Sequence, residues 1–128
     1  FDINTFIKFQ KNLKKICEEL YNFVVSKSKE GKIIAGYGAT AKSATTLNYS
    51  NIDQNLISCI YDSTPFKIDK FTPGSHIQIR DAKLLSKDNP DYTILFAWNH
   101  KNEIIEKEKK SKTIWVEYIP ELKLTYEN

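Results

Sequence analysis

Apolar residues recur every three or four positions from Ile3 to Val25, with lysines and glutamates between them. This spacing places the apolar side chains on one face and predicts an amphipathic helix that packs against the rest of the domain. The charged segment SKSKEGK, which contains Gly31, ends the pattern. We therefore expect residues 1–30 to form an N-terminal helix and residues 31–122 to form the body of a single domain.

Short apolar segments alternate with helical patterns along the rest of the chain. The five segments predicted to be strands are KIIAGYG, LISCIYD, HIQI, DYTILFAW and KTIWVEYIP. Between them, residues 40–48, 81–90 and 101–110 favour helices, and Asp81 is a candidate N-terminal cap. Such alternation predicts an α/β, Rossmann-like three-layer domain, with an open and mostly parallel sheet of about five strands.

One connection has no helical period. The segment DSTPFKIDKFTPGSH, residues 62–76, contains two prolines and a Pro73-Gly74 pair typical of a type II turn. A loop of this length inside a compact domain is more often functional than not. We therefore expect residues 62–76 to lie near a binding site.

Composition limits the classes of function. The chain has 128 residues, of which 41% are hydrophobic and 27% charged, as in an ordinary globular domain with one core. The net charge of +3 comes from lysines spread along the sequence, so we expect no nucleic-acid partner. No apolar run approaches the roughly 20 residues that span a bilayer, and the start has no signal-peptide pattern, so we expect no membrane partner and a cytoplasmic location. The sequence starts with Phe1 and contains no methionine, which suggests one domain of a longer protein.

The cysteines and histidines show no metal-binding pattern. Cys17 and Cys59 lie inside apolar periodic segments, so we predict that both are reduced core residues. His76 and His100 do not complete a set of ligands with them. We therefore expect no metal site and no catalytic residue within this chain.

The segment GYGATAKS, residues 36–43, fits two phosphate-binding patterns incompletely. A nucleotide-triphosphate loop requires glycine where Ala41 stands, which disfavours that pattern. A Rossmann turn requires Gly36, Gly38 and a small third residue, here Ala41, for close packing of helix on strand, followed by an acidic residue about 20 positions on. Asp62 lies 24 residues after Gly38. The turn and the helix N-terminus suit a diphosphate, and the alternative is a structural turn with nothing bound.

Ligands of open parallel sheets bind beyond the carboxyl ends of the strands, where the winding direction reverses. The candidate substrate-binding residues there are Gly36, Tyr37, Gly38, Ala39, Thr40, Lys42, Ser43, Asp62, Thr64, Lys67, His76, Trp98, Asn99 and His100. Lys42 is unfavourable for the dipole of its helix, which a bound anion would explain, although it could also project into solvent. Asn99 and His100 could equally cap the helix that starts near Lys101. His76 could reach the same crevice or remain solvated.

Four stretches resemble a known family. In order, GYGATAKSATTLNY, YDSTPFKIDKFTPGSHIQI, PDYTILFAWNHKNEI and YIPEL resemble the C-terminal domain of S-adenosylmethionine-dependent sugar C-methyltransferases, which methylate a ring carbon of deoxysugars attached to dTDP. The resemblance covers about residues 31–122. It implies an N-terminal zinc-binding region, a central domain that holds S-adenosylmethionine, and this domain as the binder of the dTDP-linked sugar. The run 68–70 and Gln78 depart from the family pattern, where a more basic run and a proline are usual.

The resemblance also implies a chemistry. A proton is removed from the carbon beside a ketone, and the resulting enolate attacks the methyl group of the cofactor. By the same resemblance, the general base, the zinc cysteines and the cofactor pocket lie in upstream domains of the same chain, and this part alone is inactive. Residues 36–43 would border the diphosphate or sugar, with Lys42 as the nearest positive charge, and residues 62–76 and 98–100 would close over the ligand. Two alternatives stay open: an NAD-dependent oxidoreductase-type domain in which Asp62 accepts ribose hydroxyls, and a non-catalytic interaction domain.

Overall fold

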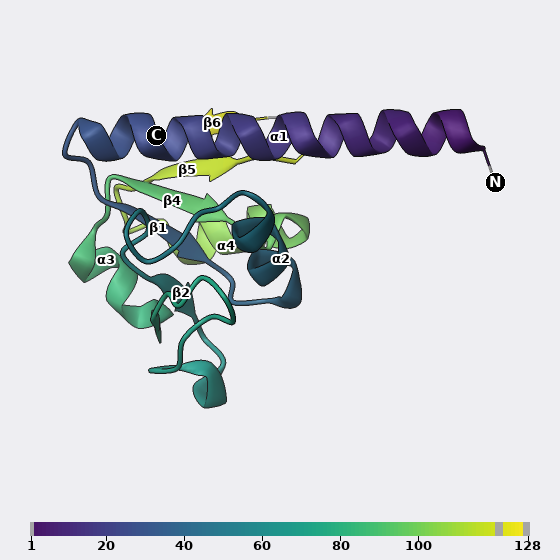
Figure 1. Cartoon of the computed structure of the whole chain (residues 1–128). Helices are drawn as coiled ribbons and strands as arrows, with labels where there is room; N and C mark the ends of the chain where they lie inside the picture. Colours follow the sequence, from purple (N-terminus) through teal and green to yellow (C-terminus); the bar gives the residue numbers. More distant parts are fainter. Residues whose placement is uncertain (1, 120–121, 127–128) are drawn as a thin grey trace.

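The structure is a computed structural model that describes residues 2–119 and 122–126. It is an α/β fold in which helices lie on the faces of one six-stranded sheet (Figure 1). The helices are α1 (Ile3–Lys29), α2 (Ala41–Tyr49), α3 (Leu85–Asp88) and α4 (Lys101–Lys107). The strands are β1 (Ile34–Tyr37), β2 (Ile60–Asp62), β3 (Ile79–Asp81), β4 (Tyr92–Leu95), β5 (Ile114–Glu117) and β6 (Lys123–Thr125). The predicted fold class and N-terminal helix are thus confirmed.

The strand order of the sheet is β3-β2-β1-β4-β5-β6. The chain winds outward from β1 to β3 and then returns to the other side of β1 through β4, so the winding direction reverses between β1 and β4. Strands β1 to β5 pair in parallel, whereas β6 pairs antiparallel with β5. The prediction of about five strands missed β6, and the sheet continues to Thr125, past the expected limit at residue 122. Pro120, which was expected to end the sheet, lies outside the described residues.

The segment between β2 and β3 is mostly irregular, as its sequence predicts. Its one helical part is the 3₁₀ turn Pro65–Lys67. Gly74 has a φ of +78°, as the Pro-Gly pair indicates, and the turn is closed by the N–H of His76, which donates to the carbonyl of Thr72 over 3.0 Å. Strand β3 begins at Ile79, three residues later than the start of HIQI. The irregular segment is therefore longer than predicted, because it continues along the chain up to Ile79.

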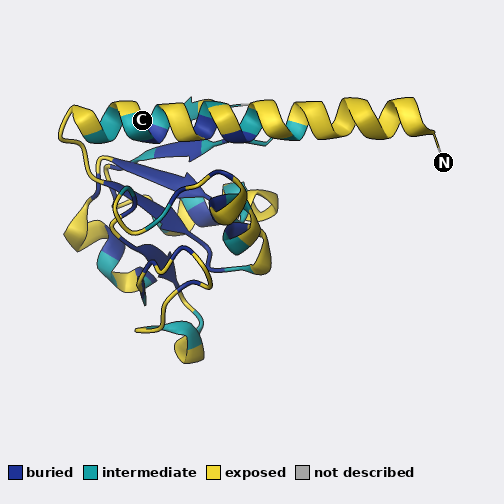
Figure 2. Ribbon diagram, in the orientation of Figure 1, coloured by how far each residue is buried: buried dark blue, intermediate teal, exposed yellow. Residues whose placement is uncertain are grey.

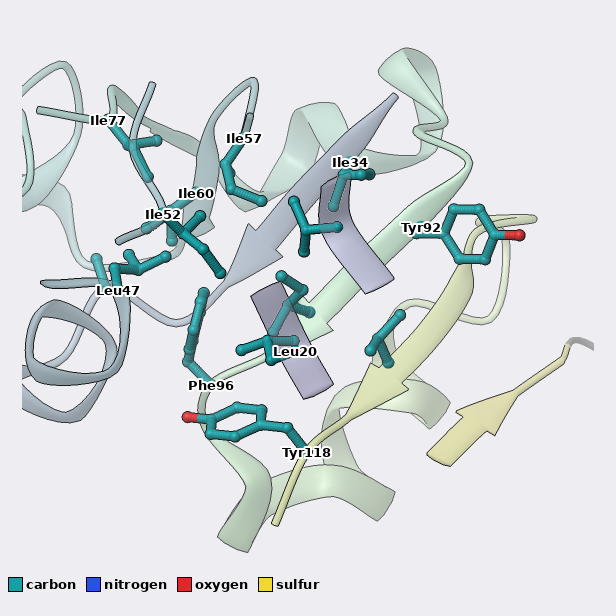
Figure 3. Packing of buried hydrophobic residues seen from close by; sticks show 14 of the residues in the cluster. Leu20, Ile34, Leu47, Ile52, Ile57, Ile60, Ile77, Tyr92, Phe96 and Tyr118 are labelled. Carbon is teal, nitrogen blue, oxygen red and sulfur yellow. The ribbon is translucent and has the colours of Figure 1, made fainter. Parts of the chain in front are cut away.

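The core has two layers because successive side chains of each strand point to opposite faces of the sheet. Ile34 belongs to the layer under α1 and α2, together with Leu20, Leu47 and Phe96 (Figure 3). The neighbouring Ala35 belongs to the opposite layer, under α3 and α4. Both sides of the sheet are therefore covered. Cys17 and Cys59 are buried and free, as predicted.

Only the second half of α1 packs on the sheet. Cys17, Leu20 and Val24 are buried, whereas the first turns of the helix extend beyond the body of the domain and are exposed (Figure 2). The side chain of Asp2 accepts a hydrogen bond from the N–H of Asn4 and caps the helix start. Although α1 is long, neither it nor any other described helix is apolar enough to cross a membrane.

Candidate functional site

The two glycines of the turn after β1 have different roles. A Cβ atom on Gly36 would lie 2.6 Å from Cε2 of Phe96, so this position keeps the side chain of Phe96 packed on β1. Gly38 has a φ of +101°, and a Cβ atom there would lie 3.1 Å from that of Ala97. Both positions thus require glycine for reasons within the protein itself. Both glycines are buried, and Gly38 also lines the cleft described below.

Thr40 and Ser43 cap helix α2. The hydroxyl of Thr40 accepts from the N–H of Ser43 over 3.2 Å, and the hydroxyl of Ser43 accepts from the N–H of Thr40 over 3.0 Å. This is a reciprocal capping box, and it occupies the polar groups of the buried Ser43. The expectation that Ala41 is the small residue packed between helix and strand is wrong, because Ala41 is exposed and Ser43 is buried in its place.

Asp62, at the end of β2, closes the glycine turn. Its carboxylate accepts from the N–H of Ala39 over 2.7 Å and from the N–H of Thr64 over 2.8 Å. Burial by itself raises the pKa of Asp62, but the bonds from Thr64 and Ala39 and the nearby Lys67 ammonium outweigh burial and hold this pKa below its ordinary value. Lys67 donates to the carbonyl of Ala39 over 2.7 Å. The turn is therefore braced by a carboxylate and an ammonium, and the N–H of Ala39 already has an anionic partner.

A cleft of about 450 Å³ opens beyond the carboxyl ends of β1, β2 and β4, where the winding direction reverses. We call it the central cleft. Seven predicted site residues line it: Tyr37, Gly38, Thr40, Asp62, Thr64, Lys67 and His100. Its position is the one that open parallel sheets use for ligands, and its volume suits a small organic ligand. The structure thus brings half of the predicted set to one place.

Five further residues line the central cleft and were not predicted: Ser63, Ala97, Glu103, Ile104 and Lys107. Three of them lie on α4 at helical spacing from His100, so one face of this helix forms a wall of the cleft. That spacing is visible in the sequence, but residues 101–110 were used only to predict a helix. The signal for a binding wall was the set of positions 100, 103, 104 and 107 on one helical face.

The polar groups of the central cleft include two cations and a neutral phenol. Lys67 and Lys107 bring positive charge, whereas Glu103 lies 3.8 Å from Nδ1 of His100. Burial, followed by the negative charges of Glu108 and Asp62, raises the pKa of Tyr37 to about 12. The hydroxyl of Tyr37 therefore stays protonated near neutral pH and can donate a hydrogen bond.

An ion pair holds α4, and with it the wall of the cleft, against the sheet. Nζ of Lys101, the first residue of α4, lies 2.8 Å from a carboxylate oxygen of Glu117 at the end of β5. Both side chains are mostly buried, at 26% and 13% exposure. Removing either partner would leave the other charge poorly solvated. This pair fixes the position of His100 and Lys107 relative to the carboxyl ends of the strands.

Four predicted site residues lie away from the central cleft. The ammonium of Lys42 lies 4.6 Å from the centre of the Trp98 ring, and both residues line a different hollow of about 320 Å³ beside α1. His76 stacks on Phe71, with 4.4 Å between the ring centres and an angle of 6°. Asn99 is exposed, and neither it nor His100 caps α4 through its side chain. The geometry therefore does not support Lys42 as the positive charge beside the glycine turn.

The remaining predicted residues support the site from beneath. Gly36, Ala39 and Ser43 are buried. As described above, Gly36 leaves room for the ring of Phe96, the N–H of Ala39 donates to Asp62, and Ser43 exchanges hydrogen bonds with Thr40. Within the described ranges, no group of three or more His, Cys, Asp or Glu residues could hold a metal ion. The central cleft thus combines hydroxyl, imidazole, ammonium and carboxylate groups, which suit a polar organic ligand.

These features define an α/β domain of Rossmann-like fold with a cleft at the reversal of the sheet. Residues 1–120 match the family described as the C-methyltransferase C-terminal domain, and this chain belongs to that family. It is also 32% identical over 103 residues to the C-methyltransferase NovU of Streptomyces niveus. The matched residues make up 80% of this chain and 24% of that protein. The chain thus spans about a quarter of the length of the curated relative that it matches.

Proposed function

We propose that this chain is the substrate-binding domain of an S-adenosylmethionine-dependent sugar C-methyltransferase, and that the central cleft holds a dTDP-linked deoxysugar. Membership in the C-methyltransferase family supports the reaction class. The observation that carries the assignment of the ligand is the grouping of Tyr37, Lys67, His100 and Lys107 around one cleft at the reversal of the sheet. These groups match the oxygen-rich, negatively charged surface of a nucleotide diphosphate sugar.

The diphosphate is held by the lysines of the cleft rather than by the glycine turn. The N–H of Ala39 is bonded to Asp62, so a phosphate at that position would have to displace a carboxylate. Lys67 uses one N–H on the carbonyl of Ala39 and has two further donors for phosphate oxygens. The protonated hydroxyl of Tyr37 donates to an oxygen of the sugar or phosphate.

The role of this chain in the reaction is to bind and orient. The acidic proton is on the sugar carbon beside a ketone, and its removal by a base leaves an enolate whose carbon forms the new bond. S-adenosylmethionine supplies the methyl group when it is bound to the enzyme. The base, the site for this cofactor and a zinc-binding region belong to other parts of the enzyme. The cleft residues hold the sugar at a fixed angle, which favours reaction at one carbon.

Calorimetric titration of the chain with dTDP and with NAD tests the proposal. We expect dTDP to bind, and Lys67→Ala to weaken this binding about tenfold, since a charged hydrogen bond contributes roughly 1.5–3 kcal/mol. Lys42→Ala is the matched control, because it removes the same charge from the neighbouring hollow and should leave the affinity unchanged. Binding of NAD without binding of dTDP would refute the proposal.

The second candidate is an NAD-dependent oxidoreductase-type domain, which the glycine turn and the position of Asp62 favour. In such a domain Asp62 accepts the ribose hydroxyls, and Asp62→Ala abolishes NAD binding. Here the same carboxylate already accepts two backbone N–H groups, so its orientation is set by the turn and by Thr64. A third candidate, a non-catalytic interaction domain, is favoured if no nucleotide raises the melting temperature.

A further inference from the structure

The first part of α1 is exposed along most of its length. We call residues 3–13 the α1 overhang; it is about 16 Å long at 1.5 Å per residue. In Figure 2 most of it extends past the sheet and is exposed, while Cys17, Leu20 and Val24 further along the helix are buried. An isolated helix of this length is marginal in water, because most helical stability in proteins comes from packing of an apolar face.

The overhang carries exposed apolar side chains, and one of them, Phe9, continues the buried face of the same helix. Ile3, Ile7 and Phe9 are 56%, 43% and 63% exposed, respectively. At 100° per residue Phe9 falls within about 40° of both Leu13 and Leu20, and Leu20 is fully buried, whereas Ile3 and Ile7 fall about 100° and 140° from Leu20. The apolar stripe that fixes α1 to the sheet thus extends as far as Phe9 in the overhang, and the exposed Ile3 and Ile7 lie beside it.

Three hollows run along α1 beside this stripe. The first, of about 630 Å³, is lined by Lys14, Cys17, Glu18, Tyr21, Asn22, Tyr49, Ser50 and Asn51. The second, of about 410 Å³, shares Lys14 and Tyr49 with it and adds Ile7 and Leu13. The third is the hollow of Lys42 and Trp98, which shares Leu13 and Cys17. Together they form a groove between α1 and α2, which we call the α1–α2 groove.

The groove carries other signs of an incomplete surface. Tyr49 and Trp98 are 54% and 36% exposed although both are large and aromatic. The hydroxyl of Ser50, which is 5% exposed, is the only buried side-chain polar atom of the described residues without a hydrogen-bond partner. Contiguous exposed apolar surface of this kind marks an interaction site in globular proteins.

We propose that the α1 overhang and the α1–α2 groove form the interface on which the remaining, methyl-donor-binding part of the C-methyltransferase polypeptide docks. This inference rests on the proposed function. The matched segment is only 24% of the length of the curated relative, and the matched family is a C-terminal domain, so most of such an enzyme lies outside the part that this chain matches. Of the two ends of the described chain, it is the N-terminal one that presents an uncovered apolar stripe.

Charge argues against a second copy of this chain as the occupant. The overhang and the turn after it, residues 3–17, contain four lysines and no acidic residue: Lys8, Lys11, Lys14 and Lys15. Asp2 precedes the overhang and caps the helix, and Glu18 and Glu19 lie 4.0 Å from Lys14 and Lys15, respectively. Two overhangs laid together would bring these lysines side by side, and like charges across an interface are unfavourable. The occupant therefore has an apolar strip flanked by acidic residues.

The test measures the rate of amide hydrogen–deuterium exchange in this chain alone and in the complete gene product that contains it. Amides of residues 6–13 are expected to exchange at least tenfold more slowly in the complete gene product. Phe9→Asp should abolish this protection, whereas Asn12→Asp, which adds the same charge at an exposed position away from the stripe, should preserve it. Sedimentation of the chain alone at increasing concentration should show a monomer.

Two outcomes overturn the proposal. One is equally fast exchange of residues 6–13 in both proteins, and the other is a dimer of the chain alone that Phe9→Asp dissociates. Binding of dTDP is read separately, by titration of the central cleft. A chain that fails to bind dTDP but gains protection along α1 would refute the proposed ligand and leave the interface intact.

Discussion

At the scale of single residues, Gly36 shows how close packing can look like a ligand motif. It occupies the first position of a phosphate-binding pattern, yet its missing side chain leaves room for the ring of Phe96. Gly36→Ala would place a methyl group 2.6 Å from Cε2 of Phe96, which forces the ring to move in a fully packed layer. We expect a loss of about 1–3 kcal/mol in the free energy of unfolding, measured by urea denaturation.

A second substitution separates this clash from a general effect of Gly36. Phe96→Leu removes ring atoms at the contact, so the double variant should lose less stability than the sum of the two single losses. The interaction energy of such a cycle is expected to be of order 1 kcal/mol in the favourable direction. Additive losses would mean that the clash with Phe96 is not the cause.

Asp62 predicts a pH dependence. Its pKa in the folded state lies below the ordinary value of 3.8, so the carboxylate stabilises the fold above that pH, and this contribution is lost as the pH falls through the folded pKa. Asp62→Asn replaces one acceptor by an N–H donor that faces a backbone N–H. We expect a loss of about 1–3 kcal/mol at neutral pH, with the difference from the wild type shrinking in acid.

Urea denaturation of both proteins from pH 7 down to pH 2.5 measures this effect. Asp53→Asn is a suitable control, because Asp53 also accepts from a backbone N–H two residues on, but lies in a turn away from the central cleft. A constant difference between wild type and Asp62→Asn across the whole range would contradict the role assigned to the carboxylate.

At the scale of elements, the capping box of α2 sets the edge of the central cleft. Thr40→Ala removes the acceptor of the Ser43 N–H, and loss of such a cap costs about 1 kcal/mol. Thr45→Ala on the same helix removes a hydroxyl bonded to the carbonyl of Ala41 and should be nearly neutral, since alanine is the better helix former. Thermal unfolding by circular dichroism distinguishes the two. Equal losses would show that the capping box has no special role.

The elements also show which features a sequence reveals and which it does not. The three- and four-residue period of apolar positions was enough to predict α1, and the alternation of helical and strand patterns was enough to predict the parallel sheet. Both patterns follow from the burial of apolar side chains. Strand β6 was missed because Lys123–Thr125 is short and polar, and its position depends on pairing with β5 rather than on its own pattern. The wall of the cleft on α4 was missed because a helix face toward solvent and one toward a ligand carry the same residue types.

Within the candidate site, residues at the ends of strands were easier to predict than contacts between residues far apart in the sequence. Tyr37 and Asp62 end buried strands and Gly38 follows one, and the order of the strands brings them together. Lys42 was placed beside the ligand because of the helix dipole, but the ring of Trp98, 56 positions later in the chain, attracts its ammonium away from the cleft. Contacts of this range depend on the packed fold and have no signature in a single sequence.

At the scale of the whole molecule, the two core layers share one sheet and should unfold together. Leu20 of α1 is fully buried in one layer, and Trp115 of β5 is buried in the other, beside Tyr37. Because Ile34 and Ala35 alternate between the layers along β1, loss of either layer exposes the other face of the same strands. Leu20→Ala is therefore expected to lower the free energy of unfolding of the entire domain by about 2–5 kcal/mol.

Two probes test this cooperativity in one experiment. In a Trp98→Phe background, Trp115 is the remaining tryptophan and its fluorescence reports the layer opposite α1, whereas circular dichroism at 222 nm reports mainly the helices. Leu20→Ala should shift both melting curves by the same amount, because two-state unfolding gives coincident transitions. Phe9→Asp, on the uncovered overhang, should shift neither. If helix signal is lost well before the fluorescence of Trp115 changes, α1 is a separately unfolding element, and its second half is bound to the sheet more weakly than its burial indicates.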